Sequence, residues 1–186
     1  DYTYEAFVCV AENTHAMVVW LDGAGNQDYS LRARFRTENG IWGTTSLVNA
    51  SEGQGLESLQ VVCSPDGNHV VIFVDNSASP SALKARVYDA DARAWEAPAF
   101  TLTTGPGPYA GLYSATRAAD GRVVVVWQEA VDATEESPSV LRARTYGAGT
   151  WSAVALLDDS TSGRMQVTAA GNDVHIRVGG PVPIAA

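Results

Sequence analysis

The chain has 186 residues, of which 46% are hydrophobic and 18% charged, so it carries enough apolar side chains for a core and too many for a disordered tail. Its 12 Lys and Arg against 21 Asp and Glu give a formal net charge of -9, which repels nucleic-acid phosphates and anionic lipid. No apolar stretch approaches the roughly 18 residues of a membrane-spanning helix. We therefore expect no nucleic-acid partner and no membrane insertion.

One pattern of short Val-rich segments recurs along the chain. Its second segment occurs at 15–20, 69–74 and 122–127, with a weaker copy at 173–178, and the ends of these copies are 54, 53 and 51 residues apart. A Leu-basic-Ala-Arg segment follows at 31–34, 83–86 and 141–144, and then a tryptophan at Trp42, Trp95 and Trp151. These landmarks share a period of about 53 residues, which indicates a repeat architecture.

Each unit is predicted to form four short strands, because its apolar runs are five to seven residues long and bounded by turn-forming residues. In chain order the expected strands are 7–12, 16–22, 31–37 and 44–49; 59–64, 69–75, 82–89 and 99–104; 112–117, 122–129, 140–146 and 152–157; and a partial unit at 165–169 and 173–178. Turns at 65–68 and 119–121 contain the Asp-Gly pairs that tight hairpins favour. No segment shows a helical period.

A four-stranded antiparallel unit of this length is typical of a β-propeller blade, which buries its faces against neighbouring blades. The sequence therefore predicts an all-β fold: residues 1–186 form one propeller domain or propeller segment. Its blades are expected at 7–49, 59–104 and 112–157, with a partial fourth blade at 165–178.

The units resemble the blades of sialidase-like, or BNR-repeat, propellers. That family carries a Ser-x-Asp-x-Gly-x-Thr-Trp turn between the third and fourth strands, and Gly149-Thr-Trp-Ser152 stands at that place. Trp42 and Trp95 occupy the matching turns, although no unit keeps the Ser, Asp and Gly at the family's spacing. The resemblance implies degenerate turns of this type and a secreted, bacterial protein.

Sialidases bind a substrate carboxylate through an arginine cluster, so the repeated arginines are the first candidates for a catalytic site. They are Arg32, Arg34, Arg86, Arg142 and Arg144. Residues that recur in every unit fill the same structural position in each blade, whereas a catalytic group is normally unique. We therefore expect a structural role for these arginines and predict no catalytic residue.

The histidines and acidic turns are candidate metal ligands. His15 and His69 each lie five residues before the end of a second strand, and neither they nor His175 has a ligand-pair spacing, so no metal site is predicted. Residues 22–28, and Asp89 and Asp91 with Glu96, have oxygen ligands suited to calcium without the EF-hand order. No other cofactor is expected.

The two cysteines, Cys9 and Cys63, each lie eleven residues before the end of a second strand. Matched positions on adjacent blades are usually too far apart for a bond. The sequence therefore favours two buried thiols.

Exposed aromatic side chains are the better functional lead, since sugars and peptides dock on aromatic faces backed by polar groups. The predicted ligand-binding residues are Tyr109, Tyr113 and Trp151; the other tryptophans, Trp20, Trp42, Trp95 and Trp127, are expected to pack between blades. The favoured function is a non-catalytic module that binds a carbohydrate or a protein. The alternatives are a sialidase-like glycoside hydrolase or lyase fragment and a structural subunit.

A half-blade leaves a strand edge unpaired, which invites association. Either segments 2–6 and 182–185 complete a fourth blade, or another chain supplies the missing strands. Two copies would give twenty-eight strands, the number in a seven-bladed ring. Association is favoured, because the tail at 179–186 has no Leu-Arg-Ala-Arg segment.

Overall fold

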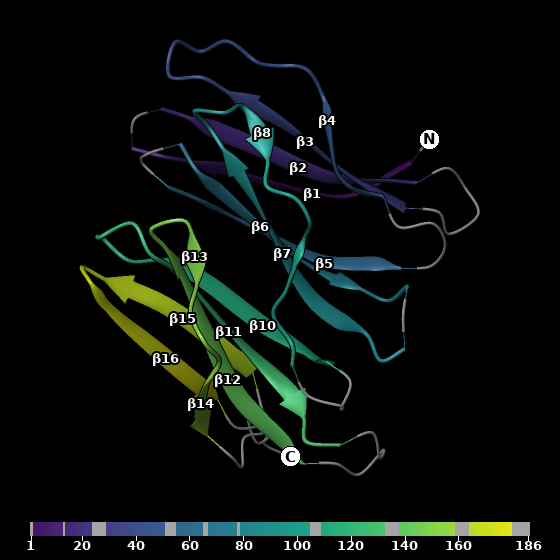
Figure 1. Ribbon diagram of the computed structural model, residues 1–186, viewed down its shortest axis with the longest axis vertical. Helices are drawn as coiled ribbons and strands as arrows, with labels where there is room; N and C mark the ends of the chain where they lie inside the picture. The colour runs from purple at the N-terminus through teal and green to yellow at the C-terminus, as the bar shows by residue number, and fades with distance from the viewer. Residues whose placement is uncertain are drawn as a thin grey trace, which may run out of the picture. The chain divides into compact units, whose positions relative to one another are not determined.

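The computed structural model describes residues 2–12, 14–23, 29–50, 55–64, 67–77, 79–104, 109–132, 138–158 and 164–179 (Figure 1). All the helices and strands it assigns there are β-strands, which confirms the all-β prediction. Within that part of the chain, no helix has the length and apolar character needed to span a bilayer. The chain forms two compact units, Asp1–Thr103 and Thr104–Ala186, which are described separately.

The first unit contains two antiparallel sheets. The first sheet has the order β1 (Tyr2–Val10), β2 (Ala16–Gly23), β3 (Tyr29–Arg36) and β4 (Ser46–Ala50). The second sheet has the order β5 (Leu56–Cys63), β6 (His69–Asp75), β7 (Ala82–Asp89) and β8 (Ala94–Trp95), and β9 (Phe100–Thr101) also pairs with β7. Each is a meander in which consecutive strands pair, as expected for one repeat.

The second unit repeats this arrangement. Its larger sheet has the order β10 (Tyr109–Arg117), β11 (Val123–Ala130), β12 (Ser139–Gly147) and β13 (Thr150–Trp151), with β14 (Ala155–Asp158) also on β12. A two-stranded sheet of β15 (Arg164–Ala170) and β16 (Asp173–Gly179) follows. The four-stranded repeat unit is thus present, whereas the number of blades in a ring stays a prediction.

The fourth strand of the second and third sequence repeats differs from the prediction. In each of these sheets it is split into two short pieces, β8 with β9 and β13 with β14. In the second sheet of the first unit Pro98 lies between the pieces, and proline has no N–H to donate to a ladder. The first strand also begins at Tyr2, earlier than the predicted residue 7.

The core of the first unit lies between the facing sides of its two sheets. From the first sheet it takes the alternate residues Met17, Val19 and Leu21 of β2 and Leu31 and Ala33 of β3; from the second it takes Leu59, Cys63, Val71 and Phe73. The period-two alternation of β2 and β3 therefore corresponds to one face turned toward the next sheet. Val124, Val126, Leu141, Ala143 and Val167 form a core of the same kind in the second unit.

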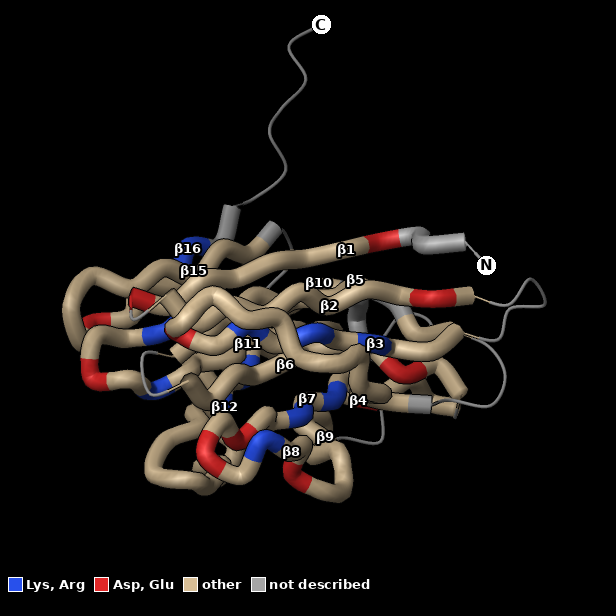
Figure 2. Tube along the Cα trace, turned by 90° about the horizontal axis from the view of Figure 1, so that it is seen from above, with Lys and Arg blue, Asp and Glu red and all other residues tan. Residues whose placement is uncertain are grey.

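The repeated arginines have the structural role predicted for them. The guanidinium groups of Arg34, Arg86 and Arg144 donate to the carbonyl oxygens of Gly43, Glu96 and Ser152 at 3.0, 3.0 and 2.9 Å. In every case the acceptor directly follows the repeated tryptophan. The basic residues appear as blue segments along the third strands in Figure 2. Each arginine thus ties its third strand to the turn that leads into the fourth.

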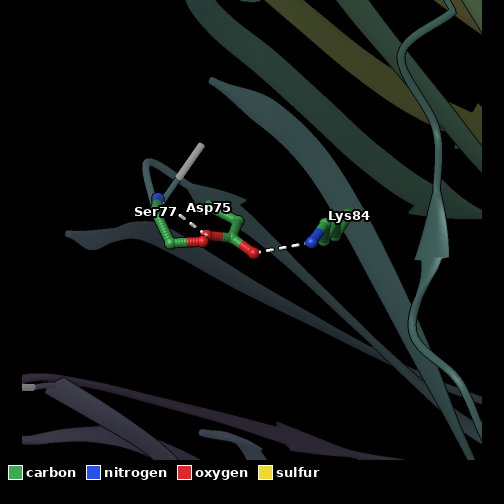
Figure 3. Close-up of polar contacts among 3 residues, drawn as sticks. All are labelled: Asp75, Ser77 and Lys84. Atoms are coloured by element: carbon green, nitrogen blue, oxygen red, sulfur yellow. Dashed lines mark hydrogen bonds and ion pairs between the residues drawn. The ribbon is translucent and has the colours of Figure 1, made fainter. Parts of the chain in front are cut away.

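A second repeated contact joins the base at the other end of the Leu-basic-Ala-Arg segment to an acid on the second strand. The pairs are Arg32 with Asp22 at 2.6 Å, Lys84 with Asp75 at 2.6 Å and Arg142 with Glu129 at 3.0 Å. Figure 3 shows the second pair, in which Asp75 also accepts from the Ser77 backbone N–H at 2.9 Å. The cross-strand partner of each base is an aromatic residue on the second strand, two positions before the acid. These partners are Trp20, Phe73 and Trp127.

Strand register corrects the predicted equivalence of the two histidines. The third strands align on Leu31 and Leu83, and five residues later Arg36 pairs with Ala16 whereas Tyr88 pairs with His69. His69 is therefore equivalent to Ala16. The prediction that it matches His15 is wrong by one residue.

The same offset explains a second correction, because Cys9 and Cys63 form a disulfide with their Cα atoms 5.6 Å apart. Cys9 pairs with Met17, whereas Cys63 pairs with His69, so the two cysteines are one position apart in the repeat. Successive side chains of a strand point to opposite faces. Cys9 therefore points toward the second sheet and Cys63 toward the first, and the prediction of two free buried thiols is wrong.

Candidate functional site

A cavity of about 330 Å³ opens between the two sheets of the first unit, where the third strands turn toward the fourth. Its lining residues come from β2, β3, β4, β7, β8 and the turns beside them: Met17, Phe35, Thr37, Ile41, Gly43, Thr44, Ser46, Tyr88, Arg93 and Trp95. This volume is at the lower end of the range for small-molecule sites.

Three aromatic rings form a continuous wall of this cavity. The ring centroids of Phe35 and Tyr88 are 5.0 Å apart, and those of Tyr88 and Trp95 are 5.2 Å apart with an edge-on geometry. Phe35 is on the face of β3 that looks toward the second sheet, and Tyr88 is on the face of β7 that looks back. The wall is thus built from both sheets, as the strand pleat requires.

Trp95 is held in place by contacts on two sides. Its indole Nε1–H donates to the Ser46 hydroxyl at 2.9 Å. The Arg86 guanidinium carbon lies 5.9 Å from the ring centroid, within the range of a cation–π contact. Arg86 also donates to the carbonyl oxygens of Glu96 and Val48, and so connects β7 to the first sheet. The aromatic wall is consequently positioned before any ligand binds.

Polar groups lie around the aromatic wall. The Thr37 hydroxyl closes its own turn by accepting from the Ile41 N–H at 3.3 Å. Thr44 is exposed to solvent, whereas Ser46 is half-buried and its hydroxyl donates to the Ala33 carbonyl at 3.4 Å. Burial raises the pKa of the Tyr88 phenol, while the nearby charge of Arg93 acts in the opposite direction. Tyr88 is therefore protonated at neutral pH and can donate a hydrogen bond.

Arg93 sits at the end of a tight turn. The Asp89 carboxylate accepts from the backbone N–H groups of Asp91 and Ala92, both at 2.9 Å, and Arg93 itself has a φ of 52°. Residues other than glycine seldom adopt this left-handed backbone conformation. The turn therefore places Arg93, an exposed residue, at the edge of the cavity.

This arrangement suits a sugar ring better than an ion. Aromatic faces pack against the apolar face of a pyranose or furanose, while hydroxyl and guanidinium groups bind its oxygens. Among the described residues that line the cavity there is no Asp or Glu. The two-carboxylate mechanism of glycoside hydrolysis has no acid pair in this lining.

The structure does not bring the sequence-predicted site residues together. The side chain of Tyr109 lies outside the described part of the chain. Tyr113 pairs with Trp127, whereas Trp151 pairs with Tyr146, which is opposite Val123. Trp127 and Val123 are four residues apart on β11, or about 13 Å along the strand. Tyr113 and Trp151 are also half-buried.

Of the tryptophans expected to pack between blades, Trp127 is fully buried and Trp42 is 41% exposed. Sequence analysis also missed the cavity, because most of its polar lining comes from turns that have no periodicity. A signal was present in the tyrosine that precedes the repeated tryptophan, seven residues before it at Tyr88 and Trp95 and five residues before it in the next sheet. Tyr146 and Trp151 form the same pair in the next four-stranded sheet, with ring centroids 5.2 Å apart.

Two of the calcium candidates have other partners. Asp22 pairs with Arg32 at 2.6 Å, and Asp89 caps its turn. Residues 24–28 of the first candidate turn lie outside the described residues.

No family model and no curated protein matches this sequence. Solved structures do: the polysaccharide lyase Uly1 matches with a TM-score of 0.66, and the Penicillium chrysogenum α-L-arabinanase, solved with arabinobiose, with 0.60. An endo-arabinase from Bacteroides thetaiotaomicron matches with 0.52. All three are 12% identical and cover 95% of this chain.

The match covers 44% of the lyase chain, 59% of the Penicillium enzyme and 69% of the Bacteroides enzyme. The chain therefore spans less than two thirds of the length of the first two proteins. At this identity the likeness concerns the fold alone. The chain therefore has a β-propeller-like fold that it shares with carbohydrate-active enzymes.

Proposed function

We propose that this chain is a carbohydrate-binding propeller segment and that the cavity of Phe35, Tyr88 and Trp95 is its sugar site. The observation that carries this proposal is the wall of three aromatic rings in a cavity of about 330 Å³ with hydroxyl groups at its rim. The fold-level likeness to a polysaccharide lyase and to arabinanases supports a saccharide rather than a peptide.

Binding of arabinobiose, arabinan and a uronate-containing polysaccharide to the full chain tests this proposal. Tryptophan fluorescence and calorimetry would measure affinity, and Thr44→Val and Trp95→Phe would each alter the cavity with a modest change in volume. Both variants should weaken binding several-fold. The matched control is Trp151→Phe, which changes the equivalent tryptophan of the second unit.

If Trp151→Phe weakens binding and the cavity variants do not, the sugar site is at the residues that the sequence suggested. If none of the three saccharides binds at millimolar concentration, the proposal is wrong.

A second candidate is a glycoside hydrolase or lyase, which the fold-level likeness favours over a purely binding module. Release of reducing ends from arabinan would indicate hydrolysis, and an increase in ultraviolet absorbance from a uronate polysaccharide would indicate elimination. Because the described lining offers no carboxylate pair, turnover by this cavity would require an acid or base from elsewhere. Loss of turnover in Tyr88→Phe would place the chemistry in this cavity.

Association with a second copy of the chain is a further candidate, and the outward face of the first sheet supports it. Val8 and Val10 of β1 are 64% and 67% exposed. Their equivalents in the second sheet, Val61 and Cys63, are covered by the first sheet. A face that the repeat normally buries is therefore open here.

Light scattering after size exclusion tests this association. We expect a dimer that the double substitution of Val8 and Val10 by Lys converts to a monomer. Leu156→Lys, which changes a leucine that is 59% exposed on β14, should leave the mass unchanged. A monomer at 100 times the concentration of the sugar-binding assay would contradict the proposal.

A further inference from the structure

Two cysteines and one histidine converge at the interface of the two sheets of the first unit, close to the cavity but outside its lining. One sulfur each from Cys9 and Cys63 and a ring nitrogen of His69 all lie within 4.8 Å of one another. Of the described residues, only these bring three such groups so close. The ligands come from two sheets, so no spacing in the sequence indicates them.

Two of the three groups are positioned by one hairpin. Cys63 on β5 and His69 on β6 are cross-strand partners, so their side chains share one face of the sheet. His69 Nε2 lies 4.0 Å from Cys63 Sγ. Cys9 faces them from β1 of the first sheet, as the disulfide requires. The strands thus hold all three groups without any contribution from loops.

We propose that, when this disulfide is reduced, Cys9, Cys63 and His69 form a Zn²⁺ site that replaces the covalent bond between the two sheets. Thiolate sulfur and imidazole nitrogen are the preferred ligands of zinc, and three protein ligands leave the fourth position for a water molecule. Zn–S and Zn–N bonds of tetrahedral geometry place sulfur and nitrogen about 3.6 Å apart. The 4.0 Å between Cys63 Sγ and His69 Nε2 is close to that separation.

The charge of such a site suits its surroundings. His69 is fully buried and Cys63 nearly so, within a cluster that includes Leu59, Val71 and Tyr88. Two thiolates and one Zn²⁺ have no net charge, so the complex avoids most of the cost of burying an ion in an apolar core. The Phe35 ring lies 5.4 Å from the His69 ring and limits the orientation of the imidazole.

The chemistry balances in two steps. A phosphine reductant attacks one sulfur and breaks the S–S bond; one water then gives its oxygen to phosphorus and its two hydrogens to the sulfurs, which leaves two thiols and a phosphine oxide. Zn²⁺ next displaces both thiol protons into solvent and accepts the imidazole lone pair. Zinc and the disulfide therefore exclude each other.

The test uses the full chain, oxidised and phosphine-reduced, with Zn²⁺ added in competition with a colorimetric chelator. The reduced chain should take up one zinc and the oxidised chain none. Zinc should also raise the unfolding temperature of the reduced chain only, and Co²⁺ in its place should give thiolate-to-metal absorption. These last two readouts separate a folded site from zinc bound to an unfolded chain.

The decisive variant is His69→Gln, with His15→Gln as its matched control, because His15 also packs against Phe35, with ring centroids 5.3 Å apart, but is not one of the three groups. His69→Gln should weaken zinc binding at least 10-fold, and His15→Gln should not. If His69→Gln does not fold, Cys9→Ser must abolish uptake in its place. Absence of zinc uptake by the reduced chain, or equal affinity in His69→Gln and the unmodified chain, would overturn the proposal.

Discussion

Cys9 on β1 and Cys63 on β5 are covalently joined although they occupy repeat positions that differ by one residue. The bond links the first strands of two neighbouring sheets across a sequence separation of 54 residues. It therefore closes a loop that contains β2, β3 and β4 of the first sheet.

Removal of this bond should lower the stability of the first unit. Closing a loop of this length in the unfolded chain stabilises the folded state by roughly 3–4 kcal/mol. Thermal unfolding in the presence of a chelator, with and without phosphine, would measure the difference. The double substitution of both cysteines by Ser should be insensitive to phosphine. An unchanged unfolding temperature of the reduced protein would show that packing alone holds the sheets together.

The disulfide also shows where sequence reasoning failed. The second strand of the second sequence repeat, β6, is His-Val-Val-Ile-Phe-Val-Asp, and every residue of it is buried. A strand without alternation carries no information on which residues face which side. The pattern of β6 therefore could not distinguish an alignment of His69 with His15 from one with Ala16. The same one-residue error placed Cys9 and Cys63 at equivalent positions.

By contrast, the third strands alternate Leu, basic, Ala and Arg, and that pattern fixes their orientation. The period, the strand order and the structural role of Arg34 and Arg86 were all predictable from it. The cavity was not, because Thr37, Thr44 and Arg93 lie in turns. Only the register brings those turns together beside Tyr88 and Trp95.

The Asp75–Lys84 pair should make stability depend on acid pH. Burial by itself raises the pKa of Asp75, but the hydrogen bonds from Lys84 and Ser77 together outweigh it and hold the pKa below its ordinary value of 3.8. The stabilisation is therefore complete above that value and is lost as the pH falls through the folded-state pKa. Urea unfolding between pH 2 and pH 6 should show this decline.

Asp75→Asn should flatten that pH dependence and cost about 1–3 kcal/mol at neutral pH, because Lys84 loses its carboxylate partner. Asp173→Asn, at the exposed start of β16, is the comparison variant and should leave the profile unchanged. Parallel pH profiles for Asp75→Asn and the unmodified chain would show that the pair does not contribute.

Glu129 in the second unit is fully buried and accepts hydrogen bonds from the Thr104 N–H at 3.0 Å and the Trp127 indole at 3.3 Å. It also forms an ion pair with Arg142, whose Nε lies 3.0 Å from its carboxylate. Glu129→Gln should destabilise the second unit by about 3–5 kcal/mol, because it leaves the Arg142 charge without its partner. Chemical unfolding monitored by tryptophan fluorescence would measure this. Glu96→Gln, an exposed acid, serves as the reference.

Arg86 should not be replaceable by lysine. It donates to carbonyl groups on both sheets and stacks on Trp95, and only a planar guanidinium satisfies all of these contacts. Arg86→Lys should shift the tryptophan emission and lower affinity at the cavity. Arg34→Lys removes one described contact, to the Gly43 carbonyl, and should have a smaller effect on both readouts. Equal effects of the two variants would contradict the positioning of Trp95 by Arg86.

Gly67 provides the most sharply defined substitution, because two separate constraints require glycine there. Its φ is +85°, and an added Cβ would lie 2.7 Å from both Ala90 Cβ and His15 Nδ1. Gly171 has a similar φ of +64° but open space around it. Gly171→Ala should therefore cost only the backbone strain, about 1 kcal/mol. Gly67→Ala adds a clash with two side chains and should lower the unfolding temperature by a larger amount. Because His15 and Ala90 belong to different sheets, equal losses for the two variants would mean that the sheets separate at this end more easily than their packing indicates.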